Sequence, residues 1–208
     1  MVRGRHLPSL GVLAALATLV AATWRYPGGT RTAPDTVGFR WSENFVCELF
    51  DAHAQNGAEN AARPLGIAGL VLLCVSLGVV FFAISRSTTS RRHRSVIEIG
   101  GIGAAVYAMF TPTPLHNVVI AVGGLFSLAA YLAIGHLMWL ERRRTLLQCW
   151  AGVLAVKAAI WIVYYGNVAY AWLPILQKLG MALAIAWLLA VRHRSTAQSA
   201  AIPSLPAA

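Results

Sequence analysis

Residues 65–85, LGIAGLVLLCVSLGVVFFAIS, form a continuous apolar run without a charged side chain. A helix rises about 1.5 Å per residue, so about 20 apolar residues span the roughly 30 Å hydrocarbon core of a bilayer. The run therefore predicts a transmembrane helix. Comparable runs occur on both sides of it, and together they predict six transmembrane helices at about 7–24, 65–85, 96–111, 116–139, 146–165 and 173–191.

The apolar character of these runs is continuous, whereas the strands of a membrane β-barrel alternate apolar and polar residues. The sequence thus predicts an all-α fold: a polytopic integral membrane protein whose six-helix transmembrane bundle forms a single domain over residues 1–194. Of the 208 residues, 58% are hydrophobic and 12% are charged, which is about half the charged fraction usual in soluble domains. This composition excludes an ordinary soluble globular protein.

The two ends of the chain need separate interpretations. MVRGRH, an apolar stretch and then Val20-Ala21-Ala22 also resemble a signal peptide with small residues at its cleavage site. The apolar run is long for such a signal, so we favour an uncleaved first helix. Residues 195–208 are rich in Ala, Ser and Pro and predict a disordered cytoplasmic tail.

The net charge of +10 is divided unevenly between the two sides of the predicted bundle. One side carries eleven of the 17 basic residues, namely Arg3, Arg5, Arg86, Arg91, Arg92, Arg94, Arg142, Arg143, Arg144, Arg192 and Arg194. Because basic residues accumulate on the cytoplasmic side, both termini are predicted to be cytoplasmic. The clusters lie at helix ends, where they contact anionic headgroups, and no nucleic-acid recognition motif accompanies them. We therefore expect membrane lipids as partners and no nucleic acid.

The first outer loop, residues 25–64, differs in composition from the rest of the chain. It contains five of the seven acidic residues, which are Asp35, Glu43, Glu48, Asp51 and Glu59. Placed on a helix at about 100° per residue, residues 41–53 separate an apolar side from a polar side with Asn44, Glu48 and Asp51. The segment therefore predicts a short amphipathic helix. Its polar face is either solvated or lines an outward-facing site.

A candidate site at this level includes His116, which opens the predicted fourth helix. One histidine and two carboxylates at the same water-accessible depth can bind a divalent metal or act as general acid and base. The sequence thus predicts His116, Glu48 and Asp51 as candidate catalytic residues and as candidate metal ligands.

Two lysines lie inside predicted spans, where a charge is costly and usually paired or functional. Lys178 is close enough to the outer end of its helix to extend outward, whereas Lys157 lies near the middle of the fifth helix. We hypothesise that Lys157 faces a polar interior and pairs with a carboxylate of the first loop or with an anionic headgroup. Both lysines are candidate substrate-binding residues, together with Asn44 and Asn56.

Several motifs of the loop occur together. A turn motif, Tyr26-Pro27-Gly28-Gly29, is followed by Asn44-Phe45-Val46-Cys47-Glu48-Leu49, Asn56-Gly57, Asn60 and Arg63-Pro64, and later by Thr113-Pro114-Leu115-His116-Asn117. This combination is similar to that of the domain of unknown function 998 family of bacterial multi-helix membrane proteins. The resemblance implies six helices in a bacterial cytoplasmic (inner) membrane and no established activity. Cys47 and Glu48 stand where Ser and Asp are commoner in that family, which argues against a serine nucleophile.

The chain contains no P-loop, H-E-x-x-H or G-x-S-x-G motif, and three hypotheses follow. The first is a non-catalytic module that binds lipid, a membrane-protein partner or a second copy of the chain. The second is a membrane-embedded lipid hydrolase or transferase that uses His116 with Glu48 and Asp51, with a divalent metal as candidate cofactor. The third is a small transporter, which the lack of an internal repeat disfavours. The aromatic residues 161, 164, 165, 170 and 172 predict an interfacial belt.

Overall fold

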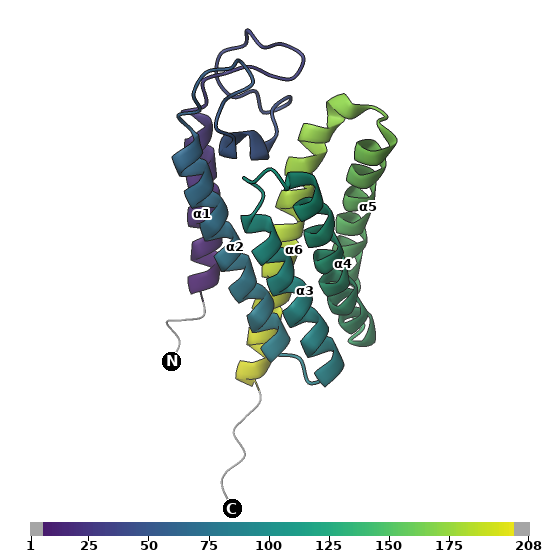
Figure 1. The fold of residues 1–208 in the computed structure, drawn as a ribbon. Helices are drawn as coiled ribbons and strands as arrows, with labels where there is room; N and C mark the ends of the chain where they lie inside the picture. Colours follow the sequence, from purple (N-terminus) through teal and green to yellow (C-terminus); the bar gives the residue numbers. More distant parts are fainter. Residues whose placement is uncertain (1–5, 202–208) are drawn as a thin grey trace, which may run out of the picture.

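The computed structural model describes residues 6–201, with side chains for residues 6–194. Regular structure in this range is helical, apart from two isolated β-bridges in the first loop. The six α-helices are α1 (Leu7–Thr23), α2 (Arg63–Arg86), α3 (Arg91–Met109), α4 (His116–Leu140), α5 (Arg144–Gly166) and α6 (Leu173–Ala201) (Figure 1). Two short 3-10 helices, η1 (Val46–Phe50) and η2 (Tyr170–Trp172), lie in loops. The predicted all-α class is confirmed.

Four of the helices are long and apolar enough to cross a membrane, namely α2, α4, α5 and α6. The remaining two differ from these in length or composition. Helix α1 is strongly apolar but has 17 residues, and α3 begins with the basic sequence Arg91-Arg92-His93-Arg94. The described chain is therefore all-helical with four candidate membrane spans.

Two helix boundaries differ from the predicted ones by five residues or more. Helix α3 begins five residues earlier than predicted, because Ser90 caps it by accepting a hydrogen bond from the His93 N–H at 3.5 Å. Helix α6 continues to Ala201, into the segment predicted as a disordered tail. Residues 202–208 of that tail lie outside the described residues.

The helices form an up-and-down bundle in which each packs against the next along the chain. Helix α2 also contacts α6, which connects the first half of the bundle to the second. In Figure 1 the first loop covers one end of the bundle, together with the α3–α4 and α5–α6 connections. The α2–α3 and α4–α5 connections lie at the opposite end. The fold thus gathers three connections at one end, and the candidate residues other than Lys157 lie there.

Small residues allow neighbouring helices to pack closely, and two tryptophan indole groups form hydrogen bonds between helices. A Cβ on Gly100 would lie 2.8 Å from the Phe126 carbonyl oxygen of α4, so α3 approaches α4 closely at this point. The Trp150 Nε1–H donates to the Tyr131 carbonyl at 2.9 Å, and the Trp187 Nε1–H donates to the Leu146 carbonyl at 3.0 Å. These bonds satisfy polar groups that no water reaches in an apolar interior.

Two apolar clusters hold the bundle. One, at the end covered by the loop, packs η1 residues Leu49 and Phe50 against α1 and α2. The other, towards the opposite end, centres on Ile134 of α4 and Trp187 of α6. The loop therefore shares a core with the helices and is a folded part of the domain.

Candidate functional site

The turn at the start of the loop depends on glycine. Gly28 and Gly29 have φ angles of +139° and +84°, which residues with a Cβ rarely adopt. A Cβ on Gly29 would also collide with the backbone of Asn56, whose N–H donates to the Gly28 carbonyl at 3.3 Å. Tyr26 adds a second link, since its hydroxyl accepts a hydrogen bond from the Gln55 N–H at 3.0 Å. The predicted turn therefore joins the two ends of the loop.

The amphipathic helix predicted over residues 41–53 is wrong: the structure has the five-residue η1, Val46–Phe50, in its place. Phe45 and Asp51, on either side of η1, have extended backbones with ψ near 150°. The side chain of Asn44 explains part of the difference, because its Oδ1 accepts the Arg40 N–H at 2.7 Å. Such side-chain bonds to the backbone compete with the helical hydrogen bonds.

Asn44 and Glu48 form a buried pair. Asn44 is 0% exposed and Glu48 is 4% exposed, so Asn44 does not lie on a solvated face, which was one of its two predicted placements. The Asn44 Nδ2 donates to Glu48 Oε2 at 2.6 Å and to the Gly29 carbonyl at 2.8 Å. Burial raises the pKa of Glu48, and the hydrogen bond from Asn44 opposes that rise.

Asn60 connects the far side of η1 to the start of α2. Its Nδ2 donates to the carbonyls of Glu48 and Asp51 at 2.9 and 3.0 Å, and its Oδ1 accepts the Ala62 N–H at 3.1 Å. Asn56, by contrast, is exposed and accepts a bond from the Ala58 N–H at 3.1 Å. Asn44 and Asn60, which belong to the motif noted in the sequence, are therefore structural supports of the loop.

Two side chains of helix α6 hold the first loop in place through hydrogen bonds to its backbone. Gln177 Oε1 accepts the Val46 N–H at 2.9 Å, and Lys178 Nζ donates to the carbonyls of Asn44 and Pro174 at 2.6 and 2.9 Å. Lys178 extends outward, as its position near the helix end suggested. Its ammonium group is occupied by backbone carbonyls, so it fastens the loop and does not line either cavity described below.

An outer cavity of about 370 Å³ lies between the loop and the ends of α4, α5 and α6. Its wall includes all three predicted catalytic residues, Glu48, Asp51 and His116. The other lining residues are Arg31, Phe45, Cys47, Gln55, Thr111, Thr113, Asn117, Ile120, Ile160, Trp161, Tyr164, Tyr165, Tyr170, Leu173 and Gln177. The structure thus brings together a histidine, two carboxylates, a guanidinium group and several aromatic rings.

His116 has a defined orientation in this wall. Its Nδ1 lies 2.9 Å from the Thr111 carbonyl oxygen, and because a carbonyl only accepts, Nδ1 carries the proton of the neutral ring. Nε2 is then an acceptor. Burial raises the pKa of Asp51, while the charges of His116 and Arg63 oppose that rise. Asp51 and His116 therefore interact electrostatically in the wall of the outer cavity.

The candidate metal site does not fit the geometry. Within residues 6–194, no three His, Cys, Asp or Glu side chains form a group that could hold a metal ion. Glu48 directs one oxygen to Asn44, and it does not form a group of metal ligands with His116 and Asp51. We therefore derive no chemistry through a metal. Cys47 beside them is not activated either, because burial raises the pKa of its thiol to about 12.

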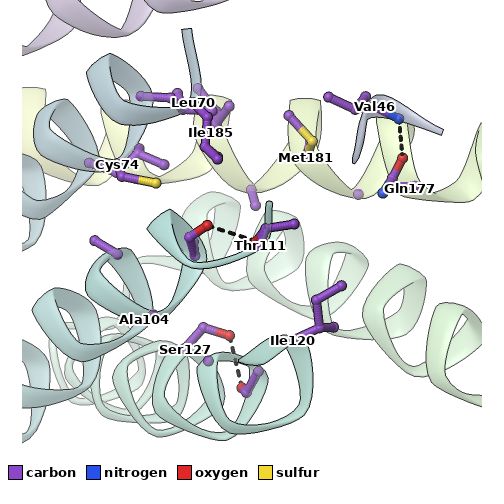
Figure 2. Close-up of a pocket in the computed structure, with 18 of the residues that line it drawn as sticks. Val46, Leu70, Cys74, Ala104, Thr111, Ile120, Ser127, Gln177, Met181 and Ile185 are labelled. Atoms are coloured by element: carbon purple, nitrogen blue, oxygen red, sulfur yellow. Dashed lines mark hydrogen bonds between the residues drawn. The ribbon is translucent and has the colours of Figure 1, made fainter. Parts of the chain in front are cut away.

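An inner cavity of about 390 Å³ adjoins the outer one inside the bundle. All six helices contribute to its wall, and Val46, Cys47 and Phe50 of the loop roof it. Figure 2 shows α2 and α6 on one side of this space and α3 and α4 on the other. Six residues line both cavities, namely Cys47, Thr111, Ile120, Ile160, Trp161 and Gln177. The two cavities therefore form one site with a polar outer part and an apolar inner part.

Lys157 lies in the wall of the inner cavity, away from the loop carboxylates. Its Nζ is 4.9 Å from the centroid of the Tyr131 ring, and within residues 6–194 no ion pair joins it to a carboxylate. The structure therefore separates Lys157 from Glu48 and Asp51 and places it in an apolar environment.

The aromatic residues of α5 were missed as site residues, because their position near the outer end suggested an interfacial belt. Trp161, Tyr164 and Tyr165 line the outer cavity instead. With Lys157 and Ile160 they recur at spacings of three and four residues, which places them on one helical face. This spacing was the signal in the sequence that could have identified them.

No family model, curated protein or solved structure matches the chain. The resemblance to the domain of unknown function 998 family therefore stays a prediction. What the site can do has to be argued from its own geometry.

Replacing Asn60 with alanine should lower the free energy of unfolding by about 2 kcal/mol, because buried polar groups lose their partners. Asn56→Ala is the matched control, since Asn56 is exposed and should cost about 0.5 kcal/mol or less. Thermal unfolding in detergent and proteolysis of the loop measure the two effects. Equal stability of the two variants would contradict the structural role of Asn60.

Proposed function

We propose that the chain is a six-helix integral membrane protein of a bacterial cytoplasmic membrane, of the domain of unknown function 998 type, with both termini cytoplasmic. The four candidate spans support the membrane location. Helix α1 contributes 17 mostly apolar residues, about 25 Å at the usual rise, and it packs beside α2. The arginine clusters of the α2–α3 and α4–α5 connections lie at the end opposite the folded loop, which supports an outward-facing loop.

We further propose that the protein binds an amphiphilic lipid in the joined cavities. The observation that carries this proposal is that an apolar cavity inside the bundle adjoins a polar one at its outer end. Most of the inner lining is aliphatic or aromatic, as a hydrocarbon chain requires. The outer cavity offers the hydroxyl and amide groups of Tyr164, Tyr170 and Asn117 as partners for a polar group.

A lipid hydrolase is the alternative that a specific observation favours. The proton on His116 Nδ1 leaves Nε2 available to take a proton from water, which would then attack a lipid ester, and Asp51 would stabilise the imidazolium formed. Glu48 is less suited to such a role because it is hydrogen-bonded to Asn44. Binding remains our first proposal, since it requires only the two adjoining cavities.

Reporters fused to the chain test the orientation. A fluorescent protein that folds in the cytoplasm should fluoresce when fused after Arg194, and an alkaline phosphatase, active only outside, should be inactive there. The same phosphatase inserted after Gly57, which is exposed in the loop, should be active. Phosphatase activity at Arg194 would overturn the proposed orientation.

Filling the inner cavity tests lipid binding. Ala104 lines this cavity (Figure 2), and Ala104→Phe should lower the affinity for oleic acid and for oleyl alcohol about tenfold, or about 1.4 kcal/mol. Ala155→Phe is the control, because Ala155 is exposed on α5 and lines neither cavity. Native mass spectrometry of the purified protein counts bound molecules. Equal binding by wild type and Ala104→Phe would contradict the proposed site.

Product analysis separates a binding protein from a hydrolase. Wild-type protein is incubated in detergent with radiolabelled phospholipid and lysophospholipid, and released acyl chains and headgroups are counted. A hydrolase should release product and lose about 10²-fold or more of its rate in His116→Ala. Gln55→Ala, a change at another residue of the outer cavity wall, is the control for an altered cavity. Intact lipid with wild-type protein would exclude the hydrolase.

A further inference from the structure

The inner cavity has a lysine side chain that the apolar ligand chain alone does not explain. Lys157 lies near the middle of α5, and none of the other lining residues carries a charge at neutral pH. Removing an ammonium group from water costs several kcal/mol. The contact with the Tyr131 ring offsets part of this cost. A negative partner would offset the remaining cost.

The protein itself supplies no such partner at this place within the described residues. Glu48 is held by Asn44, and Asp51 lies near His116 and Arg63 at the outer cavity. Neither carboxylate lines the inner cavity. The negative charge would therefore have to come from a ligand.

Three other polar side chains of the inner wall already have hydrogen-bond partners within the protein. Thr111 Oγ1 donates to the Ala108 carbonyl at 2.7 Å, and Ser127 Oγ donates to the Gly124 carbonyl at 2.9 Å. Gln177 Oε1 accepts the Val46 N–H, as Figure 2 shows. Lys157 is consequently the group in this wall best placed to bind a polar ligand atom.

We propose that the inner cavity selects an anionic single-chain amphiphile, whose carboxylate or phosphate pairs with Lys157 Nζ. This inference rests on the proposed lipid binding and names the class of lipid. The hydrocarbon chain then lies against Leu70 and Cys74 of α2 and Ile185 of α6, which line the same cavity. Ile160, about one turn along α5 from Lys157, lines both cavities, so the acidic group lies near the outer cavity.

The test compares three probes with similar oleoyl or oleyl chains: oleic acid, lysophosphatidic acid and oleyl alcohol. Each is titrated into purified wild-type protein in phosphatidylcholine nanodiscs, and dissociation constants are measured at pH 7.5. The variants are Lys157→Met, which removes the charge, and Lys157→Arg, which keeps it. Arg144→Met is the control, because it removes an exposed charge from the same helix.

Wild type should bind at least one of the two acids about tenfold or more tightly than the alcohol, and the tighter acid identifies a carboxylate or a phosphate site. Lys157→Met should lose this preference and keep its affinity for the alcohol, while Lys157→Arg and Arg144→Met should retain it. If Lys157→Met does not fold, the preference of wild type and of Lys157→Arg decides. Equal affinities of wild type for acids and alcohol would overturn the inference and leave lipid binding standing. No binding of any probe would overturn both.

Discussion

The attachment of the first loop to α6 is the interaction on which both cavities depend. Val46 and Asn44 are linked to Gln177 and Lys178 through backbone groups of the loop. These bonds hold η1 over the bundle, where it roofs the inner cavity and forms a wall of the outer one. Without them the inner cavity would open directly to the outer surface. The loop is thus a structural lid, and its acidic residues occupy positions set by these links.

Hydrophobicity determined the helices, and the sequence therefore predicted them well. Backbone groups in hydrocarbon must be satisfied within the segment, so a continuous apolar run has few alternatives to a helix. The loop lacks this constraint. Its helical pattern over residues 41–53 was misleading, because Asn44 and Asn60 form hydrogen bonds with the backbone that no periodicity analysis includes.

The candidate site was predictable only in part. Depth in the membrane was enough to place His116 near Glu48 and Asp51, and the structure does bring them to one cavity wall. Their chemical roles stay predictions. The predicted depth of a residue in the membrane could not reveal that Asn44 is buried inside the loop. Nor could it reveal that Lys178 holds the loop by donating a hydrogen bond to the Asn44 carbonyl. Those outcomes depend on how an irregular chain folds against helices distant in sequence.

The outer half of α5 contains none of the buried residues of this helix, and this bears on how a ligand would reach the site. The buried residues of this helix are Leu146 and Val153. Both precede Lys157 in the chain and therefore lie in the half of the helix farther from the loop. A hydrogen bond from the Tyr164 hydroxyl to Asn117 Oδ1, 2.9 Å long, links the outer half to α4. Because segments with few buried contacts open at low free-energy cost, this wall can move aside while the loop stays folded. If the protein binds a lipid as proposed, the lipid would then exchange sideways, between α4 and α5.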